Sequence, residues 1–592
     1  MDDQANPAGR RTWAGLGAGT TAGPGQVDAG VAPAAGGGTA GNGRGVVPAR
    51  YQPPLPLERL ILRESPAEEA VPLDVVFVGG GPAGLAGAIA LARLVQAENA
   101  AGGLREIGIG VLEKSAGLGE HCLSGAVVNP APFRTLFPEL RVEELPFRQP
   151  VERERVYFLT RNRAVRVPTP PTMRNHGNYI ASVCEVVRWL GERAEQLGVN
   201  VFTGFPAAAL LVEGERVVGV RTAPAGLDRS GRPGSGYTAP TDVSARVTAL
   251  AEGTRGLLAQ AYFEWQGVGS ENPQLYALGV KEVWETKRPV DAVVHTLGWP
   301  LAADTFGGSF FYPLEPNVLA LGLVVGLDYR AASLDVHVLL QRMKLHPLFR
   351  RTLEGGEMVE WGAKTIPEGG YWSLPARRHG HGIVVLGDSA GFVDVPSLKG
   401  IHYAMESGIL AARAIFHALK RNDVSAHALA EYDHLVADSV IARDLWKRRN
   451  LRLAFRSGLY LGGLKAALMT ATASAFPGGR IAMESDAWLP RRAGPEEPFL
   501  PDGKLTFRKL DAVFRSGNAT RDDIPSHLLV GGDVPAELAE FYTHLCPAGV
   551  YERQGERLVV NPPNCIDCKA TDVLGPRWTP REGGSGPRYR RM

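Results

Sequence analysis

Three cysteines near the C-terminus are the residues of this 592-residue chain whose types and spacing point most directly to metal chemistry. Cys565 and Cys568 form a C-x-x-C pair, and Cys546 precedes them. Cysteines spaced in this way can bind one metal centre from a single turn. A longer C-x-x-C-x-x-C run would place a further cysteine at position 571, where the chain has Thr571. Only three thiolates are therefore available in a pattern where four would hold a 4Fe–4S cluster.

The same cysteines allow two other interpretations. They could form a structural zinc site with His544 as the fourth ligand, or they could be free thiols in the protein core. Of the remaining two cysteines, Cys184 lies on an apolar helical face and Cys122 has no candidate partner beside it. Five cysteines in so long a chain do not make a disulfide framework, which favours a reducing compartment.

A glycine-rich turn at 79–84 predicts a dinucleotide site. Gly79, Gly81 and Gly84 form G-x-G-x-x-G between a short β-branched strand and a helix-like segment. Such glycines make the tight turn, let backbone approach the pyrophosphate and let helix and strand pack closely, while the helix N-terminus faces the phosphates. Glu113 ends the next predicted strand and is the candidate partner of the adenosine ribose hydroxyls, although it lies farther from the glycines than the usual ~20 residues.

A second flavin-type signal lies far downstream. Gly387 and Asp388 end a short apolar strand and precede a helix. A carboxylate in that place can accept a hydrogen bond from a ribityl hydroxyl. The tripeptide Lys399-Gly400-Ile401 fits the start of a helix that lies under the flavin ring. Together with the first glycine motif, these residues favour FAD over NAD.

The elements that must position these motifs follow from apolar periodicity. A helix is predicted at 181–197 and a surface loop at 226–236. Strands at 292–295, 309–312 and 318–325 predict a sheet in a separate substrate lobe. Because the two flavin motifs flank this region, the order predicts a mixed α/β and α+β fold, with a lobe inserted into a discontinuous Rossmann-like cofactor domain.

Composition and charge exclude some classes of protein. The formal net charge of +2 argues against nucleic acid as a partner, and no apolar run is long enough to predict a spanning helix. Residues 1–70 are rich in Gly, Ala and Pro and predict a disordered extension. The segment 451–476 mixes Leu, Ala and Gly with Arg and Lys, which predicts a segment in the lipid headgroup layer, or alternatively an amphipathic core helix. The apolar residues Phe133, Leu136 and Phe137 are candidates for a second membrane contact.

These motifs resemble those of the electron-transfer flavoprotein–ubiquinone oxidoreductase family. The resemblance runs from about Asp74 to Met592, and its C-terminal part is the most specific, since other FAD proteins share only the first glycine motif. It is carried by the segments VGGGPAGL at 78–85, HCLSGA at 121–126, NHGNY at 175–179, HTLGWP at 295–300, GGSF at 307–310, CPAGVYE at 546–552 and EGG at 582–584.

The resemblance implies three interlocked parts attached to one face of a membrane. The FAD-binding domain would have two parts, 71–260 and 376–445, around a β-rich quinone-binding lobe at 261–375. A membrane-surface segment would follow at 446–480, and a ferredoxin-like iron–sulfur domain at 481–592. The implied location is the bacterial inner membrane, peripheral on its cytoplasmic face, or the matrix side of the mitochondrial inner membrane in a eukaryote.

The implied activity is that of an electron-transferring-flavoprotein dehydrogenase. Reduced electron-transfer flavoprotein would be the donor and ubiquinone the acceptor, and no general acid or base is assigned. Gly307 and Gly308 would line the quinone headgroup pocket, with backbone N–H groups meeting a quinone carbonyl. Phe306 departs from the family pattern, which has tyrosine beside the two glycines.

The resemblance also assigns the cluster ligands. Cys546, Cys565 and Cys568 would hold a 4Fe–4S cluster, and the family's fourth cysteine is Thr571 here. The fourth ligand is therefore expected not to be cysteine; a hydroxyl, Asp567, Asp572 or water could take its place, and a 3Fe–4S cluster or no cluster are the alternatives. A competing hypothesis follows from this departure, namely an FAD-dependent reductase or hydroxylase of the same fold with a lost or altered cluster. A third is a membrane-bound flavoprotein without a cluster that acts only as a binding partner.

Overall fold

The structure is a computed structural model that describes residues 45–592 except 104–105, 126, 477 and 496. Part of the expected disordered extension at 1–70 lies outside the described residues. For residues 45–70 that expectation is wrong, because they form α1 (Leu57–Leu60) and β1 (Ile61–Leu62), and β1 pairs in parallel with a later strand. Buried Leu55, Leu60 and Ile61 anchor this segment to the core.

A six-stranded sheet forms the centre of the first domain. Its strand order is β10, β4, β3, β16, β23 and β22, and all pairs are parallel except the last. Parallel sheets are buried on both faces, which is why β3 and β16 consist entirely of buried residues. The strands are β3 (Val75–Val78), β4 (Ile109–Glu113), β10 (Asn200–Thr203), β16 (Val247–Leu250), β22 (His379–Gly380) and β23 (Ile383–Val385).

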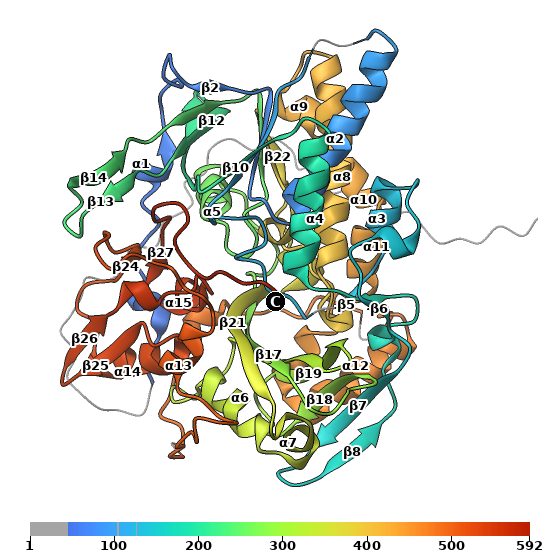
Figure 1. Ribbon diagram of the computed structural model, residues 1–592, viewed down its shortest axis with the longest axis vertical. Coiled ribbons are helices and arrows are strands. Elements are labelled where there is room, and N and C mark those ends of the chain that lie inside the picture. The colour runs from blue at the N-terminus through green and yellow to red at the C-terminus, as the bar shows by residue number, and fades with distance from the viewer. Residues whose placement is uncertain (1–44, 104–105, 126, 477, 496) are drawn as a thin grey trace, which may run out of the picture.

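Three long helices lie side by side along this sheet in Figure 1, namely α2 (Pro82–Ala100), α4 (Val183–Gln196) and α8 (Ile401–Lys420). Helix α2 begins at the first glycine motif and α8 begins at Lys399-Gly400-Ile401. The two helices approach closely, since a Cβ atom at Gly408 would lie 2.2 Å from the Ala83 carbonyl oxygen. The other helices of this domain are α3 (Ala131–Leu136), α5 (Leu257–Trp265), α9 (Ala426–Leu429), α10 (Glu431–Asp438) and α11 (Val440–Lys447).

Smaller sheets complete the domain. The region 226–236, predicted as a loop, is instead mostly a hairpin of β13 (Ala225–Leu227) and β14 (Pro233–Thr238), because its Gly and Pro residues lie within paired strands as well as at the turn. The remaining strands are β1, β2 (Val71–Pro72), β11 (Ala207–Glu213), β12 (Arg216–Thr222) and β15 (Asp242–Ser244) in one sheet, and β5 (Val127–Val128), β6 (Gln149–Pro150) and β9 (Tyr179–Ile180) in another.

A seven-stranded sheet forms the second lobe, in the order β21, β17, β20, β19, β18, β7 and β8. Two of its strands come from 154–167, which the sequence had assigned to the first part of the FAD-binding domain. Helices α6 (Val336–Lys344) and α7 (Pro347–Leu353) belong to this lobe. Its strands are β7 (Glu154–Leu159), β8 (Ala164–Val167), β17 (Tyr276–Glu285), β18 (Val293–Gly298), β19 (Gly307–Glu315), β20 (Val318–Gly326) and β21 (Glu357–Pro367).

The C-terminal region packs against both other parts, and its last residues lie at the centre of the molecule in Figure 1. The Met592 carbonyl accepts hydrogen bonds from Ser182 Oγ and Cys184 N, at 3.0 and 3.3 Å. Its elements are α13 (Lys509–Phe514), β24 (Leu528–Leu529), α14 (Ala536–Leu545), β25 (Tyr551–Gln554), β26 (Arg557–Val560), α15 (Ala570–Leu574) and β27 (Arg577–Trp578).

The segment predicted to contact lipid contains a 3-10 turn, η8 (Leu453–Ser457), and α12 (Leu459–Ala471). Within the described residues, no helix is both long and apolar enough to cross a bilayer. The second predicted membrane contact is wrong, because Phe133, Leu136 and Phe137 are buried in the core around α3.

Candidate functional site

The turn between β3 and α2 has the geometry of a phosphate cradle. A Cβ atom at Gly79 would lie 2.3 Å from the Ala251 carbonyl oxygen, and one at Gly84 would lie 2.1 Å from the Gly79 carbonyl oxygen. These two glycines are therefore required for packing. At Gly81, by contrast, a Cβ atom would meet no atom of the described residues within 4 Å. Gly81 caps α2, so this open space lies at the helix N-terminus, where a pyrophosphate fits.

Glu113 is held beside the same turn at the carboxyl end of β4. Its Oε2 atom accepts a hydrogen bond from Gly80 N at 2.9 Å, and its Oε1 atom accepts hydrogen bonds from Ser115 N and Oγ at 2.9 and 2.8 Å. The carboxylate is thus fixed next to the glycine turn, as expected for a group that binds ribose hydroxyls. The extra residues between the glycines and Glu113 are accommodated by the length of α2.

The second flavin motif joins the first. Gly387 adopts a left-handed conformation (φ +57°), and a Cβ atom there would lie 3.0 Å from the Cβ atom of Ala83 in the first turn of α2. Burial raises the pKa of Asp388 to about 6, and Thr254 Oγ1 donates to its carboxylate at 3.4 Å. A partly buried carboxylate with one weak partner is a fitting acceptor for a ribityl hydroxyl.

The residues Lys399-Gly400-Ile401 meet this motif at the start of α8. Gly400 is the residue before the helix, and its Cβ position lies 3.8 Å from Asp388 Oδ1. Lys399 Nζ donates to the Ser397 carbonyl at 2.8 Å, and burial lowers its pKa to about 8. The structure therefore brings together the two glycine motifs, Asp388 and the α8 N-terminus, and this set fits FAD.

Gly307 and Gly308 lie on β19 between β18 and β20. A Cβ atom at Gly307 would lie 2.2 Å from the Val324 carbonyl oxygen, and one at Gly308 would lie 2.6 Å from the Thr296 carbonyl oxygen. Close strand packing therefore requires glycine at both positions, with or without a quinone.

Phe306, the residue before these glycines, contacts the predicted membrane segment. The Phe306 ring lies 5.0 Å from the Phe455 ring of η8 and 3.9 Å from the guanidinium carbon of Arg452. Arg452 is itself fixed by ion pairs with Asp328 and Glu368, at 3.0 and 2.8 Å. The two glycines are thus adjacent to the segment that carries α12.

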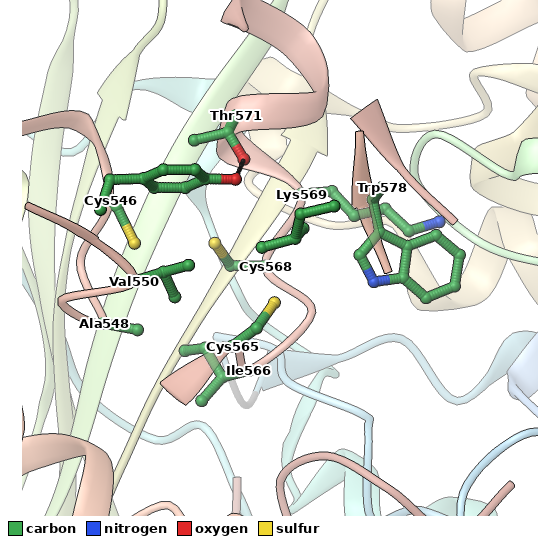
Figure 2. A pocket seen from close by; sticks show the side chains of 11 residues that line it. Cys546, Ala548, Val550, Cys565, Ile566, Cys568, Lys569, Thr571 and Trp578 are labelled. Atoms are coloured by element: carbon green, nitrogen blue, oxygen red, sulfur yellow. Dashed lines mark hydrogen bonds between the residues drawn. The ribbon is translucent and has the colours of Figure 1, made fainter. Parts of the chain in front are cut away.

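The three C-terminal cysteines line one cavity with Thr571, as Figure 2 shows. Cys546 follows α14, Cys565 and Cys568 lie on the loop before α15, and Thr571 lies in the first turn of that helix. The loop turns back because Asp567 and Lys569 adopt left-handed conformations, with φ of +54° and +64°.

The electrostatics of this cavity fit a metal centre. Burial raises the pKa of Cys565 to about 12 and also raises the pKa values of Cys546 and Cys568. A bound metal would supply the positive charge that buried thiolates need. The structure does not support His544 as a zinc ligand, because His544 does not line the cavity and its Nε2 atom lies 3.4 Å from Glu540.

A buried carboxylate connects the cluster loop to the flavin domain, a role that the sequence did not predict for it. Asp567, between Cys565 and Cys568, forms an ion pair with Lys114, the residue after Glu113. Its Oδ1 atom accepts hydrogen bonds from Trp578 Nε1 and Arg581 Nη2, both at 2.9 Å. Burial alone would raise the pKa of Asp567, but the charges of Arg581 and Lys114 hold it well below its usual range.

Two further contacts fix the same loop. Asp572 forms an ion pair with Arg255 of the flavin domain at 2.8 Å, and Cys568 accepts a backbone hydrogen bond from Thr365 on β21 of the second lobe at 3.0 Å. The only sequence signal for these partners was the presence of acidic residues beside the cysteines. The cavity therefore sits where the three parts of the molecule meet.

Comparison with known proteins identifies two regions of the chain. Residues 276–366 match the family model described as "ETF-QO, ubiquinone-binding", and residues 503–590 match "Electron transfer flavoprotein-ubiquinone oxidoreductase, 4Fe-4S". The chain is 38% identical over 575 residues to the mitochondrial electron transfer flavoprotein-ubiquinone oxidoreductase of Dictyostelium discoideum, covering 90% of this chain and 92% of that protein. It is 37% identical over 570 residues to the human protein of the same name, covering 89% and 90%.

A solved structure supports the fold alone. A geranylgeranyl bacteriochlorophyll reductase-like protein from Thermoplasma acidophilum superposes with a TM-score of 0.52 at 18% identity, over 71% of this chain and 95% of that chain. Together with the family matches, this confirms the predicted fold class, with a Rossmann-type flavoprotein core and a C-terminal 4Fe–4S domain.

Proposed function

Because the chain belongs to the electron-transfer flavoprotein–ubiquinone oxidoreductase family, we infer that it transfers electrons from reduced electron-transfer flavoprotein to ubiquinone. It is an FAD- and iron–sulfur-dependent oxidoreductase. The observation that carries the inference is the cluster loop at 565–572, which contacts both the flavin domain through Lys114 and the quinone lobe through Thr365. The competing reductase or hydroxylase activity needs no such loop.

The chain's own residues supply the binding sites for the cofactor and the quinone. FAD, when bound, accepts electrons singly and passes on two. Gly81 and the α2 N-terminus would hold its pyrophosphate, Glu113 its ribose, and Asp388 its ribityl chain. Gly307 and Gly308 would meet the quinone headgroup through their backbone N–H groups.

We also assign membrane attachment to α12. Its outer face exposes Tyr460 (72% exposed) and Leu464 (68%), together with Leu461 and Leu468, and Phe476 follows the helix. Its inner face packs through Gly462 and Met469. A contiguous apolar face with Arg456 and Lys465 beside it suits the headgroup layer of an anionic membrane.

The segment that carries this face lies next to the proposed quinone site, because Phe455 of η8 contacts Phe306. A quinone could therefore enter from the membrane without crossing water. The related proteins are mitochondrial, so we place the chain on the inner membrane, at the matrix face in a mitochondrion or at the cytoplasmic face in a bacterium. Attachment from one side requires no spanning helix.

Replacing Leu464 by glutamate should weaken binding to vesicles of phosphatidylcholine and phosphatidylglycerol more than tenfold. Burial of one leucine contributes about 1.5–3 kcal/mol, and the added carboxylate is repelled by anionic lipid. Co-sedimentation with vesicles measures the effect. Leu500→Glu is the matched control, since Leu500 is also exposed but lies outside α12. Equal binding by Leu464→Glu and the unchanged protein would contradict the assignment of α12.

The function is tested by mixing the purified protein with reduced electron-transfer flavoprotein and a short-chain ubiquinone. Oxidation of the donor should depend on the quinone and on this protein. If the protein retains FAD and its cluster but no quinone is reduced, the inference fails. Oxidation of NADPH that needs no electron-transfer flavoprotein would instead support the reductase or hydroxylase hypothesis.

A further inference from the structure

The iron–sulfur site lacks one of the ligands that a 4Fe–4S cluster normally has. Four thiolates hold such a cluster, but only Cys546, Cys565 and Cys568 line the cavity. The chain's two other cysteines do not line it, and Cys184 Sγ donates to the carbonyl of Cys122 at 3.2 Å. The residues present therefore fit three corners of a cubane cluster and leave one corner without sulfur.

Thr571 lies in the wall of the same cavity. Its side chain is buried, and it lines the same cavity as the three cysteines that are drawn in Figure 2. Its Oγ1 atom lies 3.4 Å from the Tyr551 hydroxyl, which is a long hydrogen bond. The hydroxyl therefore has no strong partner that would keep it from an iron.

The acidic residues near the cavity are already engaged. Both oxygens of Asp567 are occupied by Lys114, Trp578 and Arg581. The Asp572 carboxylate pairs with Arg255 and accepts a hydrogen bond from the backbone N–H of Trp578. Moving either carboxylate to an iron would leave buried cations unpaired, which is costly.

His527 is a further candidate. It is buried, and neither ring nitrogen has a hydrogen-bond partner among the described residues. One of its ring nitrogens lies within 4.8 Å of Cys565 Sγ. However, His527 does not line the cavity, whereas Thr571 does. The geometry therefore favours the hydroxyl.

We propose that this chain binds its cluster through three thiolates and the Thr571 oxygen, so that the iron at the Thr571 corner is the first to be lost. The proposal rests on the proposed function, which supplies the cluster. Iron–sulfur clusters prefer soft thiolate ligands, and oxygen is a harder donor. A single Fe–O bond then holds the fourth iron to the protein, whereas each of the other three irons is held by a thiolate.

The test is a titration of the anaerobically purified protein with ferricyanide, followed by EPR spectroscopy and by iron, sulfide and FAD analysis. Ferricyanide takes one electron from a cluster with two ferric and two ferrous irons. The Fe–O bond at Thr571 and the three bonds from that iron to sulfide then break and Fe²⁺ leaves, so that three ferric irons and four sulfides remain. We expect about four irons per FAD before oxidation and about three after it, with an EPR signal that appears only in the oxidised sample.

Three variants decide between the ligands. Thr571→Cys should keep four irons through the same titration, because a thiolate now holds the fourth corner. Thr571→Val has nearly the same shape without the hydroxyl and should lose the fourth iron already during purification. His527→Phe should behave like the unchanged protein. If His527→Phe loses the iron and Thr571→Val keeps it, His527 is the ligand and the proposal is overturned.

Failure of this proposal can be distinguished from failure of the proposed function. If the unchanged protein keeps all four irons on oxidation, the proposal that the iron at Thr571 is lost first is wrong. The proposed reduction of quinone by reduced electron-transfer flavoprotein does not depend on this result. If the protein holds FAD without iron or sulfide, the proposal also fails, and the quinone assay shows separately whether the activity survives. The iron content of Thr571→Cys is measured without enzymatic turnover. A defect in catalysis therefore cannot change this result.

Discussion

Replacing Gly81 by alanine is expected to give a folded protein that no longer retains FAD and reduces quinone at least about 100-fold more slowly. The backbone at Gly81 is extended (φ −87°, ψ −174°), which any residue can adopt, and the new Cβ atom would meet no described atom within 4 Å. The unliganded fold should therefore tolerate it. The same space is where backbone must approach the pyrophosphate, so the methyl group should displace the cofactor.

Two controls separate cofactor loss from misfolding. Gly84→Ala places a Cβ atom 2.1 Å from the Gly79 carbonyl oxygen, so it should damage the turn and lower stability whether or not FAD is present. Gly532→Ala lies in an exposed bend with open space and should change neither property. The ratio of flavin to protein absorbance and the far-UV circular dichroism spectrum measure the two effects.

Thermal melting gives a further distinction for Gly81→Ala. A ligand that binds only the folded state raises the melting temperature by mass action. The variant should therefore melt at the temperature of the unchanged protein stripped of FAD, and added FAD should not shift it. Normal flavin content in purified Gly81→Ala would show that the pyrophosphate does not lie against this residue.

The features that sequence reasoning found are those encoded within a few consecutive residues. The glycine turn at 79–84 and the residues Gly387 and Asp388 each combine an apolar strand with a turn, and the structure places both at strand ends. The helix predicted at 181–197 is confirmed as α4, because one face of it is apolar throughout. These features could be predicted from sequence because the glycine turns and the apolar helix face each arise from residues that are close together in the chain.

Long-range pairing left no such pattern. The ion pair between Lys114 and Asp567 and that between Arg255 and Asp572 join residues hundreds of positions apart. The strands β7 and β8 join the sheet of the second lobe although the first flavin segment surrounds them in sequence. The sequences of these segments do not predict their partners, because a charged side chain or a short strand can pair with many other segments of the chain.

Apolar composition alone also failed to distinguish surface from core. Phe133 in α3 and Phe137 just after it were predicted to contact lipid, as were the residues of α12. Both phenylalanines are buried, whereas Tyr460 and Leu464 of α12 are exposed. The difference arises from what covers each helix. Phe137 packs edge-on against Trp189 of α4, 4.8 Å away, a contact that no periodicity in its own segment predicts.

Replacing Asp567 by asparagine is expected to destabilise the C-terminal domain by about 3–5 kcal/mol, since removing one partner leaves a buried charge uncompensated. Arg581 is almost completely buried, and two of its three guanidinium nitrogens have no hydrogen-bond partner among the described residues. Asparagine keeps the shape of the side chain and removes its charge. The first thermal transition should fall by about 10 °C, and iron should be released during mild heating while FAD stays bound.

The pH dependence of this effect follows from the direction of the pKa shift. Because the pKa of Asp567 is held well below its usual range, the carboxylate is ionised and its stabilising contribution is complete above about pH 4, the ordinary pKa of aspartate. The contribution declines only as the pH falls from there toward the lowered pKa. The difference between Asp567→Asn and the unchanged protein should therefore be the same at pH 6 and pH 8.

Two further variants test whether the ion pairs, and not the shape of the loop, cause the loss. Asp533→Asn removes an exposed carboxylate from the same domain and should leave the transition unchanged. Adding Arg581→Met to Asp567→Asn removes the buried cation as well and should restore part of the stability, because no buried charge is then left without a counter-charge. Lys114, which is partly exposed, can turn to solvent in both variants. If the double variant is no more stable than Asp567→Asn alone, the buried charge of Arg581 is not what the carboxylate compensates, and the link between cluster loop and flavin domain must depend on Lys114 instead.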